Sequence, residues 1–149
     1  MNVLFVLAVV LSGLAAGAAL NGVLAMIPAL RSLDAATVLE VRHAAGPLPS
    51  QMTVVLATGA GLAGAALLAF YGNLGSDAQA LVAVATGLSG VVLGAGWFAM
   101  RVQMSLCEPR EEPARQLALT RRWEYAQLVI CAASLGALAC YASGAASVP

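Results

Sequence analysis

The groups able to do acid–base chemistry gather in one stretch, residues 101–125, which reads RVQMSLCEPREEPARQLALTRRWEY. This stretch holds five of the chain's seven basic residues and four of its seven acids. Glu124 is a candidate general base, and Arg101 or Arg122 is the candidate charge partner. His43 is a second candidate base, because imidazole titrates near neutral pH. The candidate catalytic residues are therefore Glu124, Arg101 and His43.

Aromatic and amide side chains near these groups, with one Asn in the first apolar segment, are candidate contacts for a substrate. The set comprises Trp97, Arg122, Trp123, Tyr125, Gln127 and Asn21. Several of these residues also have a purely structural interpretation. The arginines and Glu124 can form a solvated network that sets membrane topology, and Asn21 can make an interhelical hydrogen bond. A single histidine without cysteine or histidine partners is a poor metal site, and no phosphate-binding glycine loop is present. We expect no metal and no cofactor.

The composition indicates an integral membrane protein. Hydrophobic residues make up 61% of the chain and charged residues 9%, with a mean hydropathy of +0.89. Soluble domains carry about 25% charged residues, so this chain has too few charges to cover a water-facing surface. The lipid bilayer is therefore its expected partner. The formal net charge is zero, and nothing predicts binding to nucleic acid.

Four apolar segments predict the fold. They cover residues 3–30, 50–71, 78–100 and 113–144, and a span needs about 20 apolar residues. We predict one all-α domain, residues 1–149, in which four transmembrane helices form an up-down-up-down bundle. The first segment lacks a positive leader and is too long for a signal peptide, so we expect it to be retained.

A short amphipathic helix is predicted at the membrane interface between the first two spans, within residues 31–49. Asp34 or Ser32 can cap its start, and Gly46 and Pro47 can stop it. Pro28, just before this segment, can kink or help to end the first span.

The arginines predict the orientation. All seven lie in the segments 31–49 and 101–122, which share one side of a four-span chain. The positive-inside rule places both segments in the cytoplasm and both termini outside, as expected for a multi-pass protein of the cell inner membrane.

Small residues recur at spacings that favour close helix packing. Gly13 and Gly17 form one GxxxG pair, and Gly90 and Gly94 form another. Such faces let helix backbones approach within one bundle, with a second copy, or with a partner membrane protein. The centres of the spans contain no carboxylate or histidine, which argues against an ion-coupled transporter.

Two segments also suggest a family. Residues 13–46, with Pro-Ala-Leu at the exit of the first span, and the run RRWEYAQLV at 121–129 resemble the DUF1772 family of small four-helix membrane proteins. The resemblance implies that fold, and the family includes anthrone oxygenases, which oxidise aromatic polyketides with dioxygen and no evident cofactor.

Two functions are consistent with these observations. In an oxygenase of this kind, Trp97, Trp123 and Tyr125 would contact the rings, while Arg101, Glu124 and Gln127 would handle the proton and the oxyanion. In a non-catalytic membrane subunit, the glycine-rich faces would instead pack against a partner. The incomplete catalytic set favours the second.

Overall fold

The computed structural model describes residues 3–45, 48–70, 75–106 and 113–148. Some side chains within these ranges, including that of His43, are outside the part that the structure describes. The described residues are helical almost throughout, which confirms the all-α prediction for them. In chain order the helices are α1 (Val3–Asn21), the π-helix η1 (Gly22–Met26), α2 (Ile27–Arg31), α3 (Ala35–Ala45), α4 (Leu48–Phe70), α5 (Ser76–Leu106) and α6 (Pro113–Ala146).

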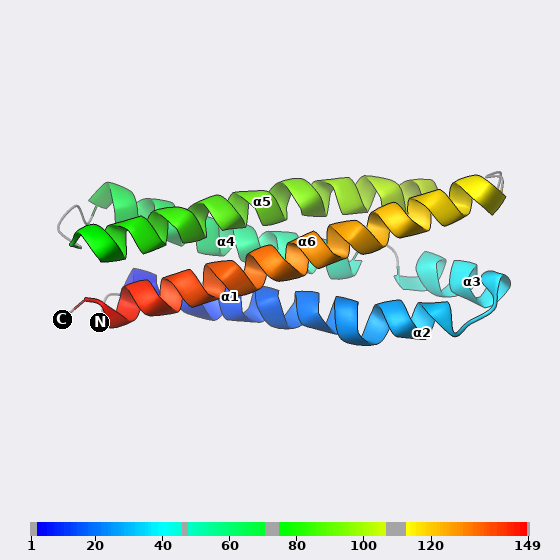
Figure 1. Cartoon of the computed structure of the whole chain (residues 1–149), viewed down its shortest axis with the longest axis horizontal. Coiled ribbons are helices and arrows are strands. Elements are labelled where there is room, and N and C mark those ends of the chain that lie inside the picture. Colours follow the sequence, from blue (N-terminus) through cyan, green and yellow to red (C-terminus); the bar gives the residue numbers. More distant parts are fainter. Residues whose placement is uncertain (1–2, 46–47, 71–74, 107–112, 149) are drawn as a thin grey trace.

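The long helices lie side by side along one axis (Figure 1). The helix α1 packs on α4 and α6, and α5 packs on the same two neighbours, so the four form a bundle. Both termini lie at one end of the bundle, while α3 and the start of α6 lie at the other (Figure 1). The arginines of α3 and α6 therefore share one rim.

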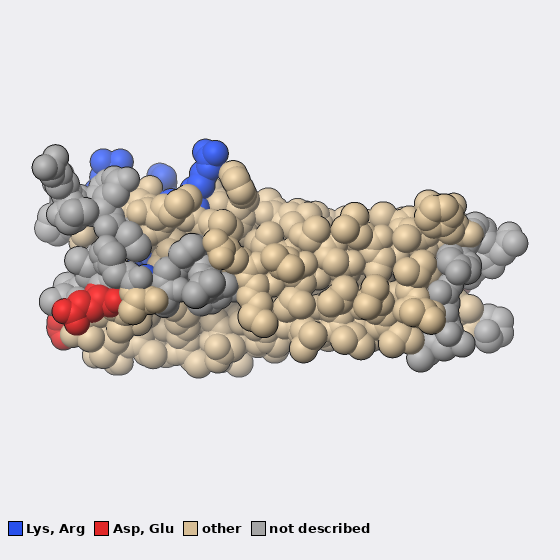
Figure 2. Space-filling view, turned by 180° about the vertical axis from the view of Figure 1, so that it is seen from behind, with Lys and Arg blue, Asp and Glu red and all other residues tan. Residues whose placement is uncertain are grey.

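Four helical segments of the described chain are long and apolar enough to cross a membrane. They are Val3–Arg31, Gln51–Phe70, Ser76–Leu106 and Arg115–Ala146. Their outer faces are apolar as well, with large exposed side chains such as Val10, Leu62 and Val91. On the face shown in Figure 2, the charged side chains gather at one end and the middle is uncharged. These features are consistent with a multi-pass membrane protein.

The first span continues through Pro28 by means of a π-turn. Proline has no N–H, so it cannot donate to the carbonyl of Leu24. The preceding turn widens, and the N–H of Ile27 donates to the carbonyl of Gly22, five residues back. The helix then runs on to Arg31. The extra residue in the turn rotates the rest of the helix by about 100° relative to an unbroken α-helix.

The short segment after this span forms a helix, α3. Asp34 caps its start: one carboxylate oxygen accepts a hydrogen bond from the backbone N–H of Thr37 at 3.0 Å, and the other accepts from the Thr37 hydroxyl at 2.7 Å. Of the two capping residues expected from the sequence, Asp34 makes this contact, whereas the Ser32 hydroxyl donates back to the carbonyl of Ala29.

Alanine is the commonest buried residue in the described interior, which also holds larger apolar side chains and a few hydroxyls. The Thr58 hydroxyl donates to the carbonyl of Val54 at 2.7 Å, which satisfies it within its own helix. Tyr141 is fully buried, and its hydroxyl donates to the carbonyl of Ala60 at 3.0 Å. These contacts keep polar atoms paired where lipid offers no alternative partner.

The glycines of α5 divide between two faces. Gly96 is buried, and a side chain there would meet Val54 of α4. Gly87, Gly90 and Gly94 are exposed, and a Cβ atom added at any of them would have no neighbour within 4 Å. The Gly90–Gly94 pair therefore does not pack inside the bundle.

Candidate functional site

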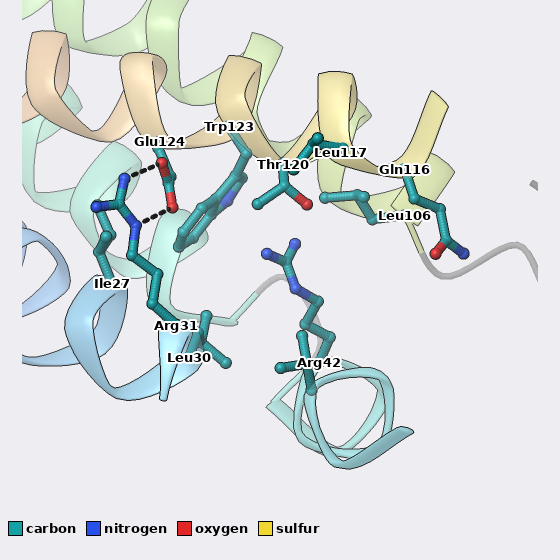
Figure 3. A pocket seen from close by; sticks show the side chains of 11 residues that line it. Ile27, Leu30, Arg31, Arg42, Leu106, Gln116, Leu117, Thr120, Trp123 and Glu124 are labelled. Atoms are coloured by element: carbon teal, nitrogen blue, oxygen red, sulfur yellow. Dashed lines mark hydrogen bonds and ion pairs between the residues drawn. The ribbon is translucent and has the colours of Figure 1, made fainter. Parts of the chain in front are cut away.

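A pocket of about 370 Å³ lies at the arginine-bearing end, between α2, α3, α6 and the last turn of α5 (Figure 3). Its apolar wall consists of Ile27, Leu30, Val38, Leu106 and Leu117. Its polar lining consists of Arg31, Arg42, Gln116, Thr120, Trp123 and Glu124. A volume of this size falls within the range of small-ligand sites, about 300–1,000 Å³.

An ion pair closes one side of this pocket. Arg31 donates from Nε to Oε1 of Glu124 at 3.0 Å and from Nη2 to Oε2 at 2.6 Å. This two-pronged geometry is the strongest form of an arginine–carboxylate contact. The Arg31 side chain is 69% exposed and that of Glu124 is 15% exposed, so water screens the attraction in part. The pair joins the end of the first span to the last.

A buried arginine connects α3 to the bundle. Arg42 is only 3% exposed, and its guanidinium carbon lies 5.1 Å from the centre of a Trp123 ring. This distance is suited to a cation–π interaction. The Nη1 of Arg42 also donates to Oε1 of Gln103 at 3.5 Å, a long hydrogen bond. One side chain of α3 thus contacts both α5 and α6.

The indole of Trp123 has an unmatched donor. The residue is 4% exposed, and its Nε1 is buried without an acceptor among the described residues. In Figure 3 the nitrogen-bearing edge of the ring is turned towards Thr120. Buried N–H groups nearly always have an acceptor, so this one is unusual.

The residues predicted as a site on α6 separate around the helix. Successive residues turn about 100°, so Trp123 and Gln127 share one side while Arg122 and Tyr125 lie elsewhere. Trp123 and Gln127 are buried, whereas Arg122 is exposed and Tyr125 is 68% exposed. Gln127 packs beside Gly22 of η1, with its amide oxygen 3.5 Å from where a Cβ atom of that glycine would lie. Of these residues, the pocket includes only Trp123, together with Glu124.

Arg101, Trp97 and Asn21 also lie away from the pocket. The Arg101 guanidinium carbon lies 5.5 Å from a ring centre of Trp97, which is 60% exposed on α5. Asn21 is exposed on α1. The side chain of His43 lies outside the described residues. The sequence suggested Arg101 or Arg122 as the charge partner of Glu124. The ion pair instead forms with Arg31.

Sequence reasoning missed Arg31 and Arg42, the two cations among the described residues that line the pocket. From the sequence, both are interpreted as solvated markers of membrane topology. A signal exists for Arg42: it lies four residues after Val38, so the two share a face of α3. That face is the one turned towards the pocket.

Within the described part of the chain, no three His, Cys, Asp or Glu side chains come together as a metal site would require. Comparisons with protein-family models, with curated proteins and with solved structures returned no match to the chain.

Proposed function

We propose that the chain is a non-catalytic membrane subunit with the DUF1772-like four-helix fold. Its spans run up-down-up-down, α3 lies at the membrane interface, and the arginine-bearing end faces the cytoplasm from the inner membrane. The four apolar spans, the capped α3 and the shared arginine rim support this proposal.

One observation carries the non-catalytic assignment. Both carboxylate oxygens of Glu124 accept hydrogen bonds from Arg31, so this carboxylate serves to join α2 to α6. The other groups expected to handle a proton or an oxyanion, Arg101 and Gln127, do not line the same pocket. The polar residues at this end connect helices, which is what a structural role needs.

The open glycine face of α5 is the surface that we assign to a second copy or a partner helix. Replacing Gly90 and Gly94 together by Leu should weaken association at least several-fold, because bulk there prevents close backbone approach. Crosslinking in native membranes and sedimentation in detergent measure this association. The control is Leu62→Ile on the exposed face of α4, which should have no effect. Unchanged association in the double variant would refute this assignment.

The orientation has a separate test at Cys107, which lies outside the described residues, just after α5. In a variant that carries Cys131→Ser and Cys140→Ser, we expect an impermeant maleimide to label Cys107 in inverted vesicles but not in intact cells. The matched control is a new cysteine at Ser147, near the opposite end, which should show the reverse pattern. Labelling of Cys107 from outside the cell would contradict the proposed topology.

The second candidate function is a cofactor-independent oxygenase of anthrone-type aromatics, and the pocket beside Trp123 favours it. Oxygen uptake by the purified protein with an anthrone tests it directly. The non-catalytic assignment expects no uptake above that of detergent alone. If the protein consumes oxygen, and Glu124→Gln abolishes this uptake while Arg122→Gln does not, the protein is instead an oxygenase.

A further inference from the structure

The pocket beside Trp123 combines an unsatisfied donor with positive charge and an apolar wall. The buried Nε1–H of Trp123 has no acceptor among the described residues, although the ring edge that bears it is turned towards Thr120 (Figure 3). A donor in this state is unfavourable until an oxygen atom reaches it. The missing component is thus an acceptor. Because the nitrogen has almost no accessible surface, a ligand supplies this acceptor when the neighbouring side chains move aside.

The charge of the lining indicates which acceptor it favours. Among the described residues, the pocket lining carries two guanidinium groups and one carboxylate, which together have a positive formal charge. The carboxylate of Glu124 is already engaged by Arg31, at the side of the pocket. Arg42 lies beside the indole, and its guanidinium is buried. An anionic oxygen placed here would accept charge-assisted hydrogen bonds, which are about twice as strong as neutral ones.

The position of the pocket indicates what the rest of the ligand resembles. Ile27 and Leu30 line it from the last turns of the first apolar span, and Leu117 lines it from α6. These side chains offer a hydrophobic surface next to the donors, at the end of the bundle where charged residues begin. A molecule with an acidic head and a single apolar chain matches both halves.

We propose that this pocket binds an acidic amphiphile through a carboxylate or phosphate head. The head accepts hydrogen bonds from the Trp123 Nε1–H and the Arg42 guanidinium, and the chain lies along Ile27, Leu30 and Leu117. This inference rests on the proposed membrane placement for the ligand's route of entry, and it is independent of whether the protein is catalytic.

Two tryptophan variants of the full chain test it. Trp123→Phe removes the N–H but keeps an aromatic ring beneath Arg42, and Trp97→Phe makes the same change on the outer face. Binding of radiolabelled dodecanoate and dodecyl phosphate is measured in uncharged detergent. We expect Trp97→Phe to bind like the unmodified protein and Trp123→Phe to bind about tenfold or more weakly, because it loses a hydrogen bond to a charged group.

The ligand panel separates the sources of this chemistry. Tighter binding of dodecanoate assigns a fatty acid head, and tighter binding of dodecyl phosphate assigns a phospholipid-like head. Dodecanol that binds as tightly as dodecanoate overturns the proposal, as does equal binding by the two tryptophan variants. Inorganic phosphate that competes as well as dodecyl phosphate also overturns it, since the chain would then contribute nothing.

A further variant keeps the test informative if Trp123→Phe does not fold. Leu117 is exposed on the pocket wall, so Leu117→Trp should fold and place an indole across the surface where the apolar chain lies, weakening binding. Retained binding in this variant counts against the site. Membrane placement is checked independently: if carbonate extraction releases the protein from membranes, the proposed function fails while the binding result still stands.

Discussion

Gly64→Val is expected to destabilise the bundle by about 3 kcal/mol, the upper part of the usual range for overpacking. A Cβ atom added at Gly64 meets Tyr141 and Thr86, with the Cε1 atom of the Tyr141 ring at 3.0 Å. Tyr141 is fully buried and donates to the carbonyl of Ala60, so its ring has no free space to enter. The midpoint of thermal unfolding in detergent should fall markedly.

The matched control is Gly87→Val on α5. This glycine is also helical, but a Cβ atom there has no neighbour within 4 Å. Its unfolding midpoint should therefore stay close to that of the unmodified protein. A double-mutant cycle adds a second check: Gly64→Ala should cost less when Tyr141→Phe has removed the hydroxyl, because the two positions are in contact. Equal effects of valine at positions 64 and 87 would contradict the packing described.

Arg42→Ala is expected to release α3 from the bundle while leaving the four spans folded. The substitution removes a cation–π contact and a long hydrogen bond to Gln103, together about 1–2 kcal/mol. Local opening of α3 should therefore become about 5–30-fold more frequent. Hydrogen exchange of the amides of residues 35–45, followed by mass spectrometry, measures this change directly.

Two further variants show whether the guanidinium itself is responsible. Arg101→Ala also removes an arginine that lies over a tryptophan, but on the outer face of α5, and should leave exchange in α3 unchanged. Arg42→Lys should fall between the unmodified protein and Arg42→Ala, because an ammonium lacks the planar group that stacks on an indole. If Arg42→Ala leaves exchange in α3 unaltered, another contact holds that helix.

The limits of the sequence are clearest at α5. From the sequence, Arg101 marks the exit of a helix over 78–100, yet α5 continues to Leu106. No proline or glycine interrupts residues 101–106, so propensity allows the extension. The extension also has a packing reason, because Gln103 is buried beside Arg42, a residue 61 positions away in the chain.

The candidate site was predictable only in its location. The cluster of charged residues near 101–125 correctly indicates the end of the molecule where the pocket lies, and Trp123 and Glu124 do line that pocket. Arg101, Arg122 and Tyr125 face outward. Their positions relative to Trp123 depend on how α5 and α6 are rotated against their neighbours. The residue types alone do not determine that rotation.

By itself, the sequence determined the four apolar helices, the capped helix between the first two and the charged end of the molecule. Helix length, hydropathy and capping are properties of neighbouring residues, so they can be read along the chain. Only the tertiary structure decided that Glu124 pairs with Arg31 and that Arg42 is buried against Trp123. Such pairs join residues that are distant in the chain, and the lateral packing and rotation of whole helices determine them.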